Sequence, residues 1–211
     1  MPVPAAPVVA RPAPGTTRPR GWAVASAVVA PLAMIGGWTL AAALQRGFDP
    51  VRATISELAT AAVAHPGVMT AGLLVTGAAH VVTAAGLRGV PVPGRVLLAL
   101  GGAGTAAVGL LPVDLVLAAH GVAAGVGFGA LALWPVASTR RQGARVLRSP
   151  VPAVATGVLL VLLAWFVLEL SAGGDRVGLS ERAVAGAQSL TPLLLVLALR
   201  AQAPRPHAPR R

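Results

Sequence analysis

The chain has 211 residues, of which 55% are apolar and only 11% are charged, and its mean hydropathy is +0.77. Soluble globular domains carry about 25% charged residues, so this composition excludes an ordinary water-soluble domain. The formal net charge is nevertheless +11, from 17 basic and 6 acidic side chains. Cysteine is absent, which excludes disulfides, thiolate metal sites and a cysteine nucleophile. High hydropathy with a basic excess indicates a membrane protein whose charges lie outside the bilayer.

Six stretches of the chain are apolar and long enough to cross a bilayer, for which a helix needs about 20 residues. They cover about residues 21–45, 67–87, 96–111, 115–136, 151–171 and 183–199. The sequence therefore predicts an all-α, polytopic integral membrane bundle of six transmembrane helices. This bundle occupies residues 21–199, between a flexible Pro/Ala-rich tail at 1–20 and a basic tail at 200–211.

The positions of the arginines predict the orientation, because cytoplasmic loops carry an excess of basic residues. With the N-terminus inside, only four arginines fall outside: Arg46, Arg52, Arg176 and Arg182. We therefore expect both termini in the cytoplasm and the Arg-rich segments against anionic lipid headgroups. Lys, Asn and Tyr are absent, which is typical of a GC-rich bacterial genome, so the expected location is a bacterial plasma membrane. Nucleic-acid binding is not expected, because no basic stripe is interleaved with aromatic residues.

The connection between the first two spans, residues 46–60, carries an unusual density of polar side chains. Asp49 followed by Pro50 is typical of a helix start, with a capping carboxylate and then proline at the first position. Apolar residues follow at helical spacing, opposite Arg52 and Ser56. This pattern predicts a short amphipathic helix that lies at the outer interface or caps the bundle.

Glycines repeat every four residues along the fourth span, at Gly121, Gly125 and Gly129. Such stripes of small residues let helices approach closely in lipid. We expect this stripe to pack against a neighbouring helix of the same chain, with a homodimer face as the alternative, so the oligomeric state stays open. Trp22 and Trp134 are expected near the inner interface, where tryptophan anchors a membrane protein.

Two further outer connections contain residues that are suited to capping helices. Asp114, in the tight connection between the third and fourth spans, is expected to cap the fourth helix. Ser180 is expected to cap the sixth helix, with Glu181 near its positive end. Capping alone would explain these groups without any ligand.

Capping does not explain the ionisable groups inside the spans, which are His80, His120 and Glu169. Such groups are costly in a bilayer and usually face the protein interior or a water-filled cavity. We expect His80 to be a packing histidine whose hydrogen bonds are satisfied. His120 lies near the outer surface, where all six acids fall, and is the stronger functional candidate.

Three blocks of residues at the outer connections resemble a known family. They are Phe48–Leu58, Gly109–Asp114 followed by His120, and Gly178–Arg182. In this order, between these spans, they resemble the bacterial six-helix integral-membrane family of domain of unknown function 998. That family has no established activity, so the resemblance implies the fold and the membrane location and leaves the function open.

The outward-facing polar groups form the candidate site. They are Asp49, Arg52, Ser56, Glu57, Asp114, His120, Glu169, Ser180, Glu181 and Arg182. We expect a multi-pass membrane protein that binds a lipid or a partner at this cluster, with a membrane-embedded lipid hydrolase or a small permease as alternatives. Structural ion pairs between the arginines and the acids are a further alternative. No cofactor is predicted. If a metal ion is bound, its ligands would come from His120, Asp114, Glu57 and Glu181.

Overall fold

The computed structural model describes residues 18–203, which form seven α-helices and one turn of 3-10 helix. In chain order these are α1 (Gly21–Ala43), η1 (Ser56–Ala59), α2 (Pro66–Gly86), α3 (Val92–Leu110), α4 (Leu117–Ala137), α5 (Arg145–Arg148), α6 (Val151–Ala172) and α7 (Val177–Gln202). All except η1 and α5 are long and apolar enough to cross a membrane, which confirms the predicted six-span, all-α fold. The predicted tails, 1–20 and 200–211, lie mostly outside the described residues, and α7 continues past the predicted end of the last span.

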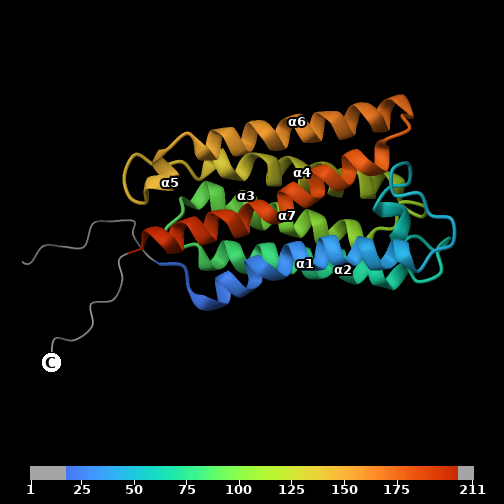
Figure 1. The fold of residues 1–211 in the computed structure, drawn as a ribbon, viewed down its shortest axis with the longest axis horizontal. Helices are drawn as coiled ribbons and strands as arrows, with labels where there is room; N and C mark the ends of the chain where they lie inside the picture. Colours follow the sequence, from blue (N-terminus) through green and yellow to red (C-terminus); the bar gives the residue numbers. More distant parts are fainter. Residues whose placement is uncertain (1–17, 204–211) are drawn as a thin grey trace, which may run out of the picture.

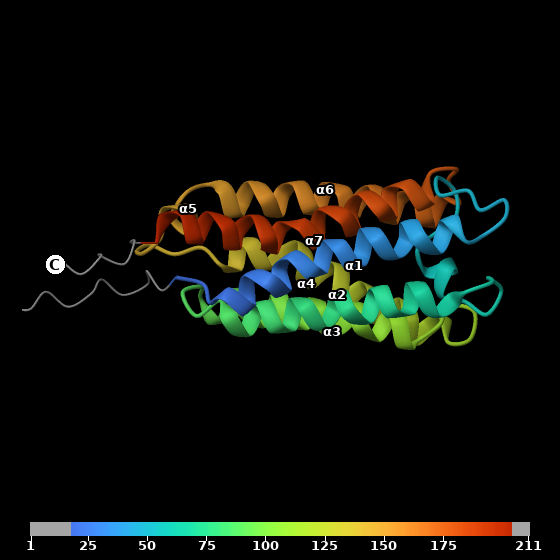
Figure 2. The same ribbon diagram turned by 60° about the horizontal axis from the view of Figure 1, so that its bottom comes forward.

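The six long helices form a closed ring (Figures 1 and 2). Each packs against the next one along the chain, and α7 closes the ring against α1. Because six spans alternate in direction, α1 begins and α7 ends at the same end of the bundle (Figure 1). We call the opposite end, which includes η1, the acidic end, and the end at which α1 begins the Arg-rich end. The acidic end holds Asp49, Glu57, Asp114, Glu169, Asp175 and Glu181.

Glycines make the closest crossings between neighbouring helices. A Cβ atom on Gly102 of α3 would lie 2.6 Å from the carbonyl oxygen of Gly77 in α2. A Cβ atom on Gly104 would lie 2.7 Å from the Cα atom of Gly127 in α4. Both distances are shorter than real carbon contacts, so only glycine permits the backbones of α2, α3 and α4 to come this close.

The predicted glycine stripe of α4 does not take part in these crossings. A Cβ atom on Gly121, Gly125 or Gly129 would meet no heavy atom within 4 Å. The prediction that this stripe packs against another helix of the chain is therefore wrong. The close contact of α4 is made by Gly127, which lies on another face of the same helix.

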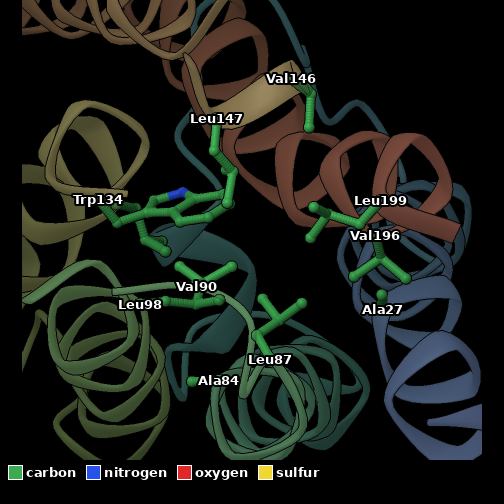
Figure 3. Close-up of a cluster of buried hydrophobic side chains, with 11 residues drawn as sticks. Ala27, Ala84, Leu87, Val90, Leu98, Trp134, Val146, Leu147, Val196 and Leu199 are labelled. Carbon is green, nitrogen blue, oxygen red and sulfur yellow. The ribbon is translucent and has the colours of Figure 1, made fainter. Parts of the chain in front are cut away.

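One of two buried apolar clusters lies at the Arg-rich end (Figure 3). In Figure 3 the indole of Trp134 lies against Leu147 of α5, with Val90 and Leu98 on its other side. Trp134 lies near the Arg-rich end of α4 but is fully buried, so the prediction that it anchors the protein at the membrane interface is wrong. The reason is α5, a short helix that the sequence pattern did not predict, whose Leu147 packs against the Trp134 indole.

Candidate functional site

The connection between α1 and α2 folds into a turn followed by η1. Asp49 and Pro50 begin the turn rather than a helix, since Oδ1 of Asp49 accepts a hydrogen bond from the N–H of Val51 at 2.8 Å. Only η1 is helical, and the apolar Ile55 and Leu58 are buried against the bundle. The predicted amphipathic helix is thus reduced to a single turn whose apolar side faces inward.

A reciprocal pair of residues fixes the start of η1. Oε1 of Glu57 accepts hydrogen bonds from the N–H and the hydroxyl of Thr54, each at 2.9 Å. The N–H of Glu57 in turn donates to Oγ1 of Thr54 at 3.2 Å. This arrangement is a capping box, whose S/T-x-x-E signature the sequence contains at Thr54–Glu57 and which was missed. Glu57 therefore has a structural partner.

Arg182 of α7 holds the turn before η1 through the backbone. Its Nη1 donates to the carbonyl oxygens of Pro50 at 2.9 Å, Ala53 at 2.8 Å and Gly178 at 3.0 Å. Its guanidinium carbon lies 5.6 Å from the centre of the Phe48 ring, within the range of a cation–π contact. Arg182 thus binds carbonyl groups and an aromatic face, and ties the turn to the first turns of α7.

Glu181 holds the residue that precedes Ser56. Its side chain is buried, and Oε2 accepts a hydrogen bond from the N–H of Ile55 at 2.5 Å. Ser180 does not cap α7, which begins earlier, at Val177. The Ser180 hydroxyl lies inside the helix and donates to the Val177 carbonyl at 2.9 Å. The capping prediction for Ser180 is therefore wrong, and the second turn of α7 instead supplies an anchor for η1.

Ser56 and His120 are brought together by η1 and α4. Oγ of Ser56 lies 3.1 Å from Nε2 of His120, and Nδ1 of His120 lies 2.6 Å from the carbonyl oxygen of Leu111. A carbonyl oxygen only accepts, so Nδ1 carries the proton and, in the neutral ring, Nε2 accepts from the Ser56 hydroxyl. The His120 ring is itself buried. The structure thus contains a serine–histidine pair oriented by a backbone carbonyl.

Two predicted site residues, Asp114 and Glu169, form hydrogen bonds that hold the connecting segments near this pair. Asp114 does not cap α4, which begins at Leu117, and its Oδ2 accepts from the N–H of Ala61 at 3.4 Å. The capping prediction for Asp114 is wrong, because the chain makes a further turn between Asp114 and the helix. Glu169 accepts from the N–H of Arg176 at 3.1 Å and so fixes the connection between α6 and α7.

The ion pairs among the described residues involve Arg52 alone. It lies 3.8 Å from Asp49 and 3.3 Å from Asp175, and all three side chains are largely exposed. Exposed pairs of this kind contribute about 0–1 kcal/mol. Arg52 therefore links two connections at the surface and does not reach the Ser56–His120 pair.

The four residues named as metal ligands do not assemble in the described part of the chain. No three His, Asp or Glu side chains there gather in a way that could hold a metal ion. Each of the four has another partner instead. His120 contacts Ser56 and Leu111, Asp114 contacts Ala61, Glu57 contacts Thr54, and Glu181 contacts Ile55.

A cavity of about 540 Å³ lies inside the ring beneath the Ser56–His120 pair. Its walls are mainly apolar side chains from α2, α3, α4, α6 and α7. At its rim, Leu117 of α4 and Val167 and Leu170 of α6 are exposed. Most of the exposed lining residues thus lie on α4 and α6, on the side that would face the hydrocarbon region of a membrane, and Glu57 of η1 is also exposed, at the acidic end of the cavity.

Four polar side chains line the deep part of the cavity, namely His80 of α2, Thr105 of α3, and Gln188 and Ser189 of α7. Thr105 and Ser189 donate to carbonyl oxygens of their own helices, whereas His80 and Gln188, each 1% exposed, face the cavity with unpaired atoms. Nε2 of Gln188 donates to the carbonyl of Phe128 at 2.9 Å, but its Oε1 and both ring nitrogens of His80 have no hydrogen-bond partner. His80 is thus buried as predicted but is not satisfied. Gln188 lies seven residues after Glu181, roughly 10 Å further along the helix. It was missed because a neutral amide within a span did not stand out.

Comparison with known protein families gives one match. The model of the family described as "Protein of unknown function (DUF998)" matches residues 27–198. The matched range contains all three outer connections, the Ser56–His120 pair and the residues that line the cavity. Neither a curated protein nor a solved structure matches the chain.

Proposed function

We propose that the protein binds a lipid-like amphiphile in the cavity at the acidic end of the bundle. The chain belongs to the DUF998 family, whose description names no activity, so the proposal is argued from the cavity itself. The cavity of about 540 Å³ is the observation on which this proposal rests. Ligand sites typically have volumes of about 300–1,000 Å³, with apolar walls and a few polar groups that fix the orientation of the ligand. The cavity fits this description.

The position of the exposed rim favours a ligand from the bilayer over one from water. The exposed rim residues Leu117, Val167 and Leu170 are apolar, and they face the side that a bilayer would cover. At the acidic end, η1 and its hydrogen-bonded turn border the cavity, and the exposed Glu57 is a charged residue there. The permease alternative has less support, because the six long helices run without a break, whereas transporter sites are commonly built on broken helices.

Polar groups at both ends of the cavity indicate the chemistry of the ligand. Ser56 and His120 lie at the outer end, and His80 and Gln188 lie at the deep end. A buried polar group without a partner costs about 1–3 kcal/mol. A plain hydrocarbon tail would leave His80 and Gln188 unpaired. We therefore infer an amphiphile with an apolar body and a hydrogen-bonding group at each end.

A pair of glycine variants tests the binding site. Gly125 lines the cavity, Gly129 does not, and a Cβ atom at either position would meet no neighbouring atom within 4 Å. Native mass spectrometry of the protein in mild detergent should detect a bound lipid in the wild type and in the control Gly129→Leu. Gly125→Leu should lose it, because leucine occupies the cavity. Equal retention by the two variants would contradict the proposal.

We also infer the orientation and the surroundings of the Arg-rich end. It faces the cytoplasm of a bacterial plasma membrane, because basic residues are retained on that side. Arg141, Arg145 and Arg148 are exposed around α5, whereas Arg140 donates to the carbonyl of Gly89. Each exposed arginine near an anionic membrane surface contributes about 1 kcal/mol of attraction. These three residues are the proposed contacts to anionic headgroups.

A further inference from the structure

We propose that Ser56 and His120 act as nucleophile and general base and cleave an acyl ester in the amphiphile held by the cavity. This inference rests on the proposed lipid binding and assigns chemistry to the outer end of the same site. Nucleophilic catalysis by serine needs a base within hydrogen-bond reach and a third group that orients the base. Ser56, His120 and the Leu111 carbonyl meet these three requirements, at 3.1 Å and 2.6 Å.

The Leu111 carbonyl makes His120 a base in the correct tautomer. Leu111 follows the last residue of α3, where a helix end leaves carbonyl groups without an intrahelical partner. This free carbonyl accepts a hydrogen bond from Nδ1–H, which keeps the proton on Nδ1 and leaves the Nε2 lone pair directed at the Ser56 hydroxyl. Because a neutral carbonyl stabilises an imidazolium less than a carboxylate does, we expect slower turnover than in enzymes with a serine–histidine–aspartate triad.

The loops at the acidic end hold Ser56 in place over the cavity. Ser56 is the first residue of η1, and the Thr54–Glu57 capping box fixes the turn that contains it. Glu181 holds the N–H of Ile55, immediately before Ser56. Glu57 and Glu181 are therefore positioning residues, and Ser56 lines the outer end of the cavity, where the polar head of a bound amphiphile would lie.

The reaction is an acyl transfer followed by hydrolysis. Ser56 Oγ attacks the ester carbonyl carbon while His120 Nε2 takes the hydroxyl proton. The bond from the carbonyl carbon to the alcohol oxygen breaks, and His120 returns the proton to the departing alcohol. Water, deprotonated by His120, then attacks the acyl-serine, which releases a carboxylic acid and restores the Ser56 hydroxyl. The products are one alcohol and one acid for each ester and water, and no oxidant, reductant or metal ion is consumed.

A fluorophosphonate probe tests whether Ser56 is activated. Attack by Ser56 would expel fluoride and leave a phosphonyl group on Oγ, which peptide mapping locates by mass. We expect the adduct on Ser56 in the full-length protein in detergent, no adduct on Ser56→Ala, and labelling slowed at least 100-fold in His120→Ala. The control is Ser171→Ala, since the Ser171 hydroxyl is exposed at the same end and donates to the Leu168 carbonyl. This control should label as the wild type does.

Hydrolysis of p-nitrophenyl octanoate gives an independent readout. The wild type and Ser171→Ala should release p-nitrophenol at equal rates, and Ser56→Ala should fall to the rate without protein. Absence of a Ser56 adduct on the wild type, or hydrolysis unchanged in Ser56→Ala, would overturn the catalytic proposal. Bound lipid in native mass spectra of Ser56→Ala reports separately on binding and confirms that the variant is folded. If the wild type binds lipid but is not labelled at Ser56, only the catalytic proposal is overturned. If the wild type carries no lipid, the proposed lipid-binding function is contradicted.

Discussion

The hydroxyl of Ser56 lies 3.1 Å from Nε2 of His120, although 64 positions separate the two residues in the chain. Each residue is held by a different part of the acidic end. Hydrogen bonds from α7 and the capping box hold Ser56, and the end of α3 orients His120. The polar connections thus fix the positions of Ser56 and His120 at the outer end of the apolar cavity.

Removing the Glu181 carboxylate should loosen η1. Glu181→Ala leaves the N–H of Ile55 without its buried acceptor, which costs about 1–3 kcal/mol of stability. Glu181→Gln keeps an oxygen acceptor and should cost less. Thermal unfolding in detergent should give the highest unfolding temperature for the wild type, a lower one for Glu181→Gln and the lowest for Glu181→Ala. Equal stability of the two variants would show that the hydrogen bond to Ile55 does not hold η1.

Alanine substitutions should lower the stability at glycines that pack against a neighbouring helix but not at glycines of the stripe. Gly77→Ala places a Cβ atom against the backbone of α3, and overpacking of this kind costs about 1–3 kcal/mol. The Cβ atom of Gly125→Ala meets no neighbouring atom, so this variant should unfold at the wild-type temperature or above it, since alanine favours a helix over glycine. Thermal unfolding of the two variants side by side checks the prediction. A larger loss for Gly125→Ala would restore the stripe as a packing surface.

The polar groups deep in the cavity should destabilise the lipid-free protein. His80→Leu removes two ring nitrogens that have no hydrogen-bond partner, so we expect delipidated protein to unfold at an equal or higher temperature. The same variant should retain less lipid in native mass spectra, because one hydrogen-bonding group for the ligand is lost. A loss of stability greater than about 1 kcal/mol would instead show that His80 makes a hydrogen bond in the folded protein.

Single cysteines can report the orientation without background, because the chain has no cysteine of its own. Ser171 lies at the acidic end and Gln142 at the Arg-rich end, and both are exposed. A membrane-impermeant maleimide added to intact cells should label Ser171→Cys and leave Gln142→Cys unlabelled until the cells are broken. The reverse pattern would contradict the inferred orientation.

The hydrophobic pattern was sufficient to predict the six spans, because each needs only length and low charge. It could not predict which face of a span packs. The stripe at Gly121, Gly125 and Gly129 and the contact residue Gly127 are equally small, and only the ring arrangement distinguishes them. Trp134 was placed at the interface for the same reason, since a sequence does not show that α5 covers it.

The sequence predicted which residues gather at the candidate site but not which of them contact one another. The outer polar groups do gather at one end, yet only Ser56 and His120 form a pair suited to chemistry. Asp114 and Ser180 were misassigned because helix starts shift by a few residues when a preceding turn satisfies the backbone. The orienting group of His120 is a backbone carbonyl, which no residue type could have indicated.

Photo-cross-linking tests the lipid-binding cavity most directly. A diazirine-bearing fatty acid with a terminal hydroxyl group, added to the full-length protein in detergent and irradiated, should attach to cavity residues of α4 and α6 such as Leu117, Gly125 and Val167. Gly125→Leu should abolish these adducts, and Gly129→Leu should retain them. Adducts confined to residues outside the cavity, such as Leu32 of α1, and unchanged in Gly125→Leu, would contradict the account.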